Sequence, residues 1–225
     1  MCTQACVRQH AGMQTTQGQA VATIAQHLAD DEIHVWRLSY RRELGREPLR
    51  ALLSVYLGQS PEELSLIAGD HGRPALAAPH GALEFNWSHS GDRALLAIAR
   101  GITPGIDLER KRTRTHVLDI AERFFCAEEA AALAMLDDLQ RPDAFLELWT
   151  AKEAVLKALG RGLAFGLDRL RFAVAPAMPA MLWLDEDDAS QWQLHPLPAD
   201  GDFFATLAWR GAPRRVRRWT LAGAD

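Results

Sequence analysis

The order of apolar and polar side chains in the first half of the chain predicts strands and an intervening helix. Residues 33–38 alternate apolar and polar side chains, which is typical of a strand with one buried face. Between Arg46 and Gly58 the leucines recur at helical spacing, and the glycine is a common helix end. Residues 95–99 are wholly apolar, which favours a buried strand, and residues 106–109 predict the next strand.

Helices and strands are also interleaved in the second half. Helical spacing appears at residues 120–125 and 130–139 and most clearly at residues 145–159, where Gly160 and Gly162 follow as end signals. Strand-like segments occupy residues 170–174, 181–184, 192–194, 203–209 and 216–221. Both halves therefore have strand–helix–strand order with strands that need not be parallel, which predicts an α+β fold.

We expect the chain to divide into a leader and two halves. Residues 1–30 are rich in Gln, Ala and Thr with weak apolar periodicity, which predicts a loose, partly helical or disordered leader. Glycines and a proline within residues 101–105 punctuate the end of one strand before the next. We therefore place an N-terminal half at residues 31–103 and a C-terminal half at residues 104–225.

The composition is that of an ordinary globular protein. The 225 residues are 48% hydrophobic and 24% charged, enough for one large domain or two small ones. We find no apolar stretch long enough to cross a bilayer, and the first residues lack the basic and apolar segments of a secretory signal. These features predict a cytoplasmic protein.

Charge and cysteine content exclude further classes. With 25 basic and 29 acidic residues the formal charge is −4, so no overall field attracts nucleic acid or a membrane. The dense basic run at residues 214–218 more often decorates a solvated edge strand than binds phosphates. Cys2, Cys6 and Cys126 complete neither a disulfide framework nor a zinc site, and we expect free thiols.

Carboxylates provide the first candidate chemistry. Asp107 and Glu109 lie two apart on a predicted strand, so both leave the same face. Glu153 lies in a predicted helix with Lys157 and Trp149 on the same stripe. Three carboxylates converging from a strand and a helix suit Mg²⁺, which takes carboxylates and completes its shell with water and phosphate. Taken singly, each feature is more often a solvated strand face, a surface ion pair or a core tryptophan.

The segment Phe-Asn-Trp-Ser-His-Ser-Gly at residues 85–91 is a second candidate. Its hydroxyl, imidazole and backbone N–H groups are suited to gripping a phosphate, whereas the alternative is an ordinary turn. Ser88 and His89 also suggest a nucleophile and its base. However, adjacent residues of an extended chain point to opposite faces, which disfavours a direct bond between these two side chains.

Read together and in order, these segments resemble the surfactin-synthetase-activating type of 4′-phosphopantetheinyl transferase. The matching motifs are Gly-Arg-Pro at residues 72–74, Phe-Asn-Trp-Ser-His-Ser at 85–90, Gly-Ile-Asp-Leu-Glu at 105–109, Phe-Phe-Cys-Ala-Glu-Glu at 124–129 and Trp-Thr-Ala-Lys-Glu-Ala-Val-Leu-Lys at 149–157. The last is the family's W-x-x-K-E-A-x-x-K pattern, followed by its glycine-rich tail. The resemblance covers residues 33–172 or so, and a compatible β-rich end follows.

The resemblance implies a fold and a reaction. The fold is a pseudo-dimer of two similar α+β halves with coenzyme A, a substrate, in the cleft between them. The enzyme is a holo-[acyl-carrier-protein] synthase, which moves the 4′-phosphopantetheine arm of coenzyme A onto a serine of an apo acyl or peptidyl carrier protein. Mg²⁺ is required, and adenosine 3′,5′-bisphosphate is released. One chain holds both halves, which favours a monomer.

The resemblance also implies a role for each matching residue. Asp107, Glu109 and Glu153 would take the metal, with Glu129 at the family's acidic position near it. Ser88 and His89 would hold the 3′-phosphate, and Arg73 would reach the adenosine end. Lys157 would contact the pyrophosphate and stabilise the leaving group. Glu153, or a water on the metal, would take the proton of the attacking serine.

The chain departs from the family near its N-terminus. Residues 38–46 are short where relatives carry a longer basic stretch, and Arg41, Arg42 and Arg46 are the candidates to replace it. The departure affects part of the 3′-phosphate clamp and leaves the metal ligands untouched. Family carriers are acidic on their recognition helix, and a basic patch of Arg110, Lys111, Arg112 and Arg114 could meet them, or could be a solvated loop.

Two other functions stay open at this point. A Mg²⁺-dependent phosphodiesterase or nuclease would use the same carboxylates, although the chain lacks the basic surface that nucleic acid needs. A carrier-binding protein without catalysis would have lost coenzyme A binding through its shortened N-terminal region. The presence of Asp107, Glu109, Glu153 and Lys157 disfavours that second alternative.

Overall fold

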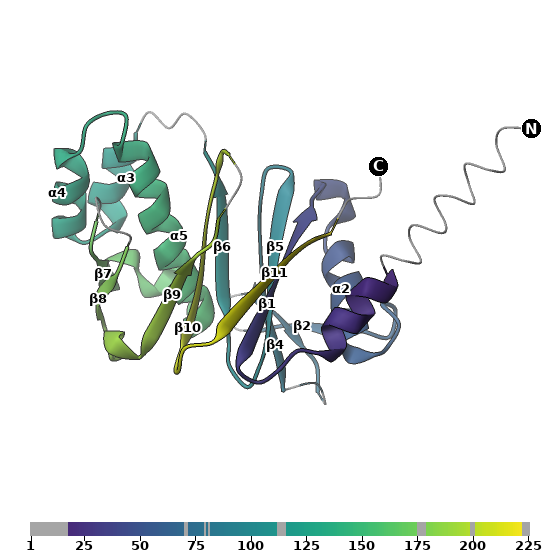
Figure 1. Cartoon of the computed structure of the whole chain (residues 1–225). Helices are drawn as coiled ribbons and strands as arrows, with labels where there is room; N and C mark the ends of the chain where they lie inside the picture. The colour runs from purple at the N-terminus through teal and green to yellow at the C-terminus, as the bar shows by residue number, and fades with distance from the viewer. Residues whose placement is uncertain are drawn as a thin grey trace, which may run out of the picture.

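The computed structural model describes residues 18–69, 72–78, 80, 82–111, 116–174, 179–198 and 201–221. Two sheets stand side by side in the middle of the molecule, with helices on both outer sides (Figure 1). Helix α2 (Glu47–Leu57) covers one side, and α3 (Val117–Phe124), α4 (Ala127–Met135) and α5 (Arg141–Leu159) cover the other. This arrangement confirms the α+β fold class.

The larger sheet has the strand order β11-β1-β5-β4. Its strands are β1 (Glu32–Ser39), β4 (Leu83–Ser90), β5 (Arg93–Arg100) and β11 (Arg215–Leu221). β1 pairs antiparallel with β5 and parallel with β11, with Trp36 opposite Trp219. The strand predictions at residues 33–38, 95–99 and 216–221 are therefore confirmed. β11 is an edge strand, as its run of arginines indicated.

The second sheet is antiparallel, with the order β6-β10-β9. Its strands are β6 (Gly105–Arg110), β9 (Trp192–Pro196) and β10 (Phe203–Arg210). Two small sheets pair β2 (Leu66–Ala68) with β3 (Pro74–Leu76) and β7 (Leu170–Phe172) with β8 (Met181–Leu184). Short 3-10 helices occupy Arg42–Leu44, Leu163–Phe165, Leu167–Arg169 and Ala189–Gln191.

Glycines end the two helices where the sequence placed their ends. Gly58 follows α2 and Gly160 follows α5, each in the left-handed conformation that an L side chain adopts only with strain. Their N–H groups bond back to carbonyl oxygens of the last turn. α4 differs from its prediction because it ends at Met135, before the expected residue 139.

Apolar side chains form three clusters in the described residues. One packs α2 against the outer face of the larger sheet around Trp36 and Leu53. A second surrounds α5 around Phe145 and Leu156. The third fills the space between the two sheets, around Ile33 and Ile106. The sheets are therefore joined through a continuous apolar layer, and β6 lies against it with Ile106 and Leu108.

The expected leader and halves correspond only in part to the structure. Residues 18–26 form a helix whose Val21 and Ala25 are buried against the α2 cluster, so this part of the leader belongs to the folded body. Cys2 and Cys6 lie outside the described residues. β11 belongs to the C-terminal half by sequence, yet it pairs with β1. The likeness of the two halves stays a prediction. Within the described residues no helix combines the length and apolar character that spanning a membrane requires.

Candidate active site

Side chains of β4 replace backbone pairing where the two sheets meet. Every second residue of β4 from Asn86 to Ser90 accepts a hydrogen bond from a backbone N–H of β6. The bonds run from Ile106 to Asn86 Oδ1 (2.7 Å), from Leu108 to Ser88 Oγ (3.3 Å) and from Arg110 to Ser90 Oγ (3.1 Å). Because buried N–H groups need partners, this ladder fixes the register of β6 against β4.

The same hydroxyl groups orient the carboxylates of β6. Ser88 Oγ donates to Asp107 Oδ1 at 3.0 Å, and Ser90 Oγ donates to Glu109 Oε2 at 3.2 Å. Asp107 and Glu109 thus leave the same face of the strand, as their spacing predicted. Asn86 and Ser90 have roles in the site that sequence reasoning missed. The signal for them was the period of two along residues 86–90.

Helix α5 brings a cation to Asp107. Lys157 Nζ lies 2.6 Å from Asp107 Oδ1, 3.1 Å from Ser88 Oγ and 3.2 Å from the carbonyl oxygen of Ile106. Gly105 permits this approach, because a Cβ added there would lie 1.9 Å from the carbonyl oxygen of Ala154 in α5. The glycine of the Gly-Ile-Asp-Leu-Glu segment is therefore required by close packing of helix on strand.

Glu153 completes the group from the same helix. It lines a cavity of about 330 Å³ between β4, β6 and α5. The lining residues are Trp87, Ser88, His89, Asp107, Leu108, Glu109, Trp149, Glu153 and Lys157. Burial, and after it the negative charge of Asp107, raises the pKa of Glu153 to about 7. Six of the predicted site residues, from three distant segments, thus surround one cavity.

His89 belongs to an aromatic cluster at this cavity. Its ring stacks on Tyr40 with 4.2 Å between centroids, and the ring of Trp87 approaches the edge of Tyr40. Burial, assisted by the charge of Lys157, lowers the pKa of His89. Ser88 does not hydrogen-bond to His89; its partners are Asp107, Leu108 and Lys157. The nucleophile–base reading of this pair therefore has no support.

The carboxylates fit a divalent cation in chemistry but are not arranged as a finished metal site. Among the described residues no group of three or more His, Cys, Asp or Glu side chains has the geometry to hold a metal ion. Lys157 pairs with one oxygen of Asp107. The other, Oδ2, is buried with no hydrogen-bond partner. A buried carboxylate oxygen left without a partner, beside two further carboxylates, is suited to a hard cation.

Glu129 lies elsewhere, which corrects its placement near the metal. It is 1% exposed, and Lys152 Nζ contacts its Oε2 at 2.7 Å. Its oxygens also accept the N–H groups of Cys126 and Phe172 at 3.1 and 2.8 Å. These bonds cap α4 and anchor β7, so Glu129 is a structural residue. Lys152, which also donates to the carbonyl oxygens of Leu167 and Leu170, was missed because its burial depends on tertiary packing.

The predicted arginines differ in their surroundings. The Arg73 guanidinium donates to the carbonyl oxygens of Phe85 (2.8 Å), Pro104 (3.3 Å) and Lys157 (2.9 Å). Arg73 therefore joins β4, the segment before β6 and the end of α5, and it lines a separate cavity of about 220 Å³. Arg42 and Arg46 are exposed, and neither lines the cavity around Glu153.

The basic patch after β6 is partly outside the described residues. Arg110 is exposed, and its guanidinium lies 3.8 Å from Asp92. Lys111 pairs with Asp143 of α5 at 2.6 Å. Arg112 and Arg114 lie outside the described residues. Two of the four cations thus have acidic neighbours within the chain.

Comparison with known proteins assigns the chain to a family. Residues 103–208 match the model of the 4′-phosphopantetheinyl transferase superfamily. The chain is 32% identical to the 4′-phosphopantetheinyl transferase HetI of Nostoc sp., over 85% of this chain and 93% of that protein. It is also 32% identical to a 4′-phosphopantetheinyl transferase of Bacillus subtilis, over 58% of this chain and 56% of that protein.

A solved structure is a more distant match. The holo-[acyl-carrier-protein] synthase of Thermotoga maritima aligns with 48% of this chain and 62% of its own, at 21% identity and a TM-score of 0.38. That likeness is too weak to add to the assignment. The near full-length similarity to HetI carries it, and the segment that matches the family model, residues 103–208, contains Asp107, Glu109, Glu153 and Lys157. The chain therefore belongs to the 4′-phosphopantetheinyl transferase superfamily and is an enzyme of that class.

Proposed function

We propose that this enzyme transfers the 4′-phosphopantetheine moiety of coenzyme A to a serine of an apo acyl or peptidyl carrier protein, with Mg²⁺, and releases adenosine 3′,5′-bisphosphate. The observation that carries the proposal is the convergence of Asp107, Glu109, Glu153 and Lys157 on one cavity in a chain of this family. Carboxylates beside a lysine are suited to a metal-bound pyrophosphate.

Asp107, Glu109 and Glu153 are the residues that would hold Mg²⁺. The unpartnered Oδ2 of Asp107 and the raised pKa of Glu153, about 7, both support a cation there, because it would relieve the repulsion among buried carboxylates. When bound, the ion supplies neutralisation of the pyrophosphate charge and polarisation of the phosphorus under attack. Glu129 is not part of this set, since its oxygens are engaged by Lys152 and by backbone N–H groups.

The transfer forms one bond and breaks another. The carrier serine oxygen attacks the β-phosphorus of coenzyme A, the P–O bond to the α-phosphate breaks, and adenosine 3′,5′-bisphosphate leaves with the electron pair. The serine proton would pass to the carboxylate of Glu153 or to a water on the metal; without the metal, burial and the charge of Asp107 raise the pKa of Glu153 to about 7. Glu153 would act both as ligand and as base.

Lys157 and His89 would act on the phosphates. Lys157 Nζ, held 2.6 Å from Asp107, lies at the same cavity and would stabilise the charge that develops on the leaving phosphate. His89 would meet the 3′-phosphate, and negative charge there would oppose the present lowering of its pKa. Ser88 lines the same cavity and would bind the 3′-phosphate together with His89.

Arg73, Arg42 and Arg46 would serve the nucleotide end of coenzyme A. Arg73 lines a cavity of about 220 Å³ together with Pro74 and Phe85, and we assign the adenosine to it. The three carbonyl oxygens that Arg73 already binds favour a role in shaping this cavity. Arg42 and Arg46, both exposed before or at the start of α2, would approach the 3′-phosphate from outside.

The experiment is a carrier-modification assay. The enzyme is incubated with coenzyme A, Mg²⁺ and, in separate reactions, an apo acyl carrier and an apo peptidyl carrier, and intact carrier mass is measured. We expect a gain of one phosphopantetheine, abolished by EDTA and restored by Mg²⁺. Glu153→Gln should fold and lose transfer, because it removes charge without changing volume. Unchanged carrier mass at saturating coenzyme A would disprove the proposal.

We further propose that one chain acts alone, in the cytoplasm. The residues that line the cavity around Glu153 come from both halves of this chain, which supports a site built by one chain. Coenzyme A and apo carriers are cytoplasmic reactants. Light scattering of the active enzyme would give the mass of one chain, 24.9 kDa, if this is right.

A further inference from the structure

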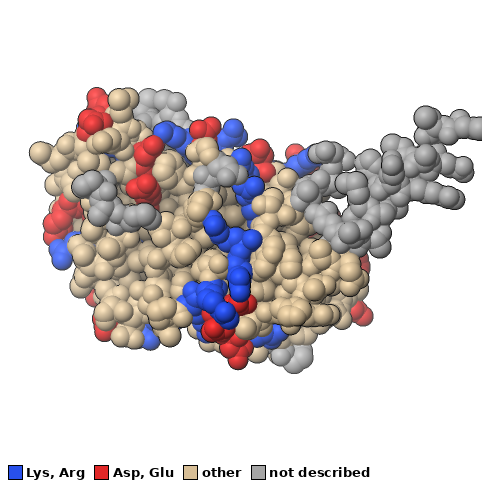
Figure 2. All heavy atoms as spheres, viewed as in Figure 1, with Lys and Arg blue, Asp and Glu red and all other residues tan. Residues whose placement is uncertain are grey.

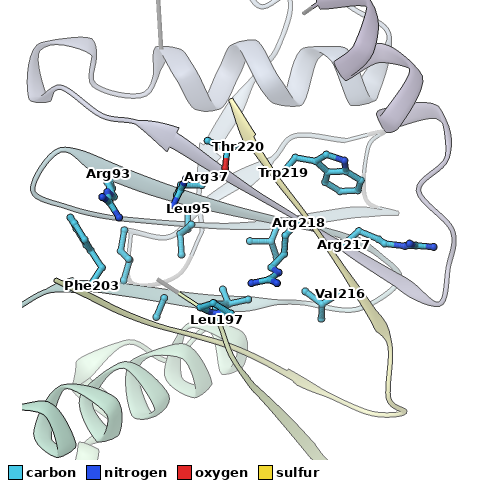
Figure 3. Close-up of a pocket in the computed structure, with 14 residues that line it drawn as sticks. Arg37, Arg93, Leu95, Leu197, Phe203, Val216, Arg217, Arg218, Trp219 and Thr220 are labelled. Carbon is cyan, nitrogen blue, oxygen red and sulfur yellow. The ribbon is translucent and has the colours of Figure 1, made fainter. Parts of the chain in front are cut away.

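A groove of about 690 Å³ opens between the two sheets, on the opposite face of β6 from the active site (Figure 3). Its upper wall is the inner face of β1, β5 and β11, and its lower wall comes from β6, β10 and Leu197. Val35, Leu95 and Leu108 form an apolar floor that continues into the core between the sheets. The carboxylates of β6 point away from it, because Leu108 alternates with them.

The upper wall of the groove carries a group of positive charges. Arg37, Arg93 and Arg218 share one face of the sheet, since the register places Val35 opposite Arg218 and Ser39 opposite Arg93. None of the 14 described residues that line the groove is acidic. Figure 2 shows basic side chains along the middle of this face, over the junction of the two sheets. Like charges gathered over an apolar floor favour an acidic ligand.

The arginines on the other face of β11 are neutralised within the chain. Arg217 Nε lies 3.2 Å from Glu32, and Arg215 lies 3.2 Å from Asp31. Arg218 faces the groove instead, so the alternation of the strand divides the basic run at residues 214–218 between two faces of the sheet. Arg218 lies among groove residues of which none, within the described part of the chain, is acidic.

The backbone of β11 provides a second, independent feature. β11 ends the sheet, and among the described strands it pairs only with β1. Five consecutive residues, 216–220, line the groove, so the groove follows the backbone and not one row of side chains. An edge with N–H and C=O groups directed outwards can accept an added strand.

We propose that an extended acidic segment of a partner protein binds here by adding as a strand to the outer edge of β11. Its backbone pairs with β11 over residues 216–220, a carboxylate meets Arg218, and an apolar side chain packs on Leu197. The Arg93 guanidinium, 4.2 Å above the Phe203 ring, closes the far end of the groove. This site is separate from the proposed transferase site and does not depend on it.

The test uses a fluorescein-labelled peptide of alternating Glu and Val, with the 7-residue length of β11, added to the full chain at fixed ionic strength. Fluorescence anisotropy should show saturable binding, and the matched Lys–Val peptide should not bind. Methylating alternate backbone amides of the Glu–Val peptide should abolish binding, because strand addition needs those N–H groups. If the methylated peptide binds equally well, or if the Lys–Val peptide binds as tightly, the proposal is overturned.

Variants locate the site. Arg218→Glu should weaken peptide binding by at least about tenfold, and Arg218→Gln by less, because charge reversal also repels the peptide. Arg123→Glu makes the same charge change at an exposed residue of α3 and should leave peptide binding unchanged. Glu153→Gln should also bind the peptide normally, whatever its transfer activity. Wild-type affinity for the Glu–Val peptide in a folded Arg218→Glu variant would refute strand addition at this site.

Discussion

Lys157 Nζ lies 2.6 Å from Asp107 Oδ1, so the cation of α5 occupies the carboxylate that the metal would use. Ser88 Oγ contacts both groups, at 3.1 Å from Lys157 and 3.0 Å from Asp107. In this arrangement the lysine and a divalent cation compete for one carboxylate. A pyrophosphate, by contrast, would attract both.

The first prediction concerns Lys157→Met. Removing the ammonium should strengthen Mn²⁺ binding in the absence of coenzyme A, because the competing positive charge is lost. Transfer should nevertheless fall by about 10²–10³-fold, the usual effect of removing one group that stabilises developing charge. Calorimetric titration with Mn²⁺ and the carrier assay check the two effects. Weaker Mn²⁺ binding in Lys157→Met would contradict the competition.

The second prediction is a pH dependence of the metal-free protein. The pKa of Glu153 is raised from 4.5 to about 7, so the folded state holds this proton more tightly than the unfolded state does. The resulting stability is present below about pH 4.5 and is lost as the pH rises through about 7. In EDTA, the free energy of unfolding of Glu153→Gln should therefore rise relative to that of wild type over this pH window, by about 1–3 kcal/mol.

Urea unfolding of both proteins in EDTA at about pH 5 and about pH 8 measures this difference, which bound Mg²⁺ should reduce. Glu147→Gln is the control for the effect of Mg²⁺. Burial also raises the pKa of Glu147, but no role in the site is assigned to this residue. A pH-independent difference between Glu153→Gln and wild type would mean that Glu153 ionises normally in the fold.

The local patterns in the sequence predicted most of the strands and the main helices but not β2, β3, β4 or the helix at residues 18–26, and the roles of the site residues came from the resemblance to a family. Asp107 and Glu109 share a face because strands alternate, and Glu153 and Lys157 share one because helices repeat near four residues. Both repeats depend only on residues close in sequence, so they can be seen in the sequence and are kept in the folded protein. The placement of α5 against β6 followed from the resemblance to a family, and the close contact at Gly105 explains why it works.

The contacts between distant segments could not be predicted in the same way. Nothing local indicates that β11 pairs in parallel with β1, which lies more than half the chain away. For the same reason, the period of two at residues 86–90 could mark Ser90 as one of a row but could not identify Glu109 as its partner, because that bond requires β4 and β6 to be neighbours. Glu129 looked like a ligand because its position in the motif was acidic, but the packing of α4 buries it beside Lys152.

The third prediction tests Ser90 as a positioning residue. Ser90→Ala removes the donor to Glu109 and the acceptor of the Arg110 N–H, so kcat should fall about three- to tenfold while the KM for coenzyme A stays within about twofold. Mn²⁺ affinity should fall in parallel, because Glu109 loses its orientation. Ser90→Thr keeps the hydroxyl and should restore both. If Ser90→Thr restores neither kcat nor Mn²⁺ affinity, Ser90 has only a structural role.

The last prediction separates Glu129 from the metal. Lys152→Met leaves the carboxylate of Glu129 buried without its cation, which should lower the free energy of unfolding by about 3–5 kcal/mol. Lys152→Met combined with Glu129→Gln should recover part of that loss, since no charge then remains buried. Urea unfolding measures both. At a temperature where the double variant is folded, its Mn²⁺ affinity should match wild type, because the carboxylates of Asp107, Glu109 and Glu153 are unchanged. A large loss of Mn²⁺ affinity in the folded double variant would return Glu129 to the metal site.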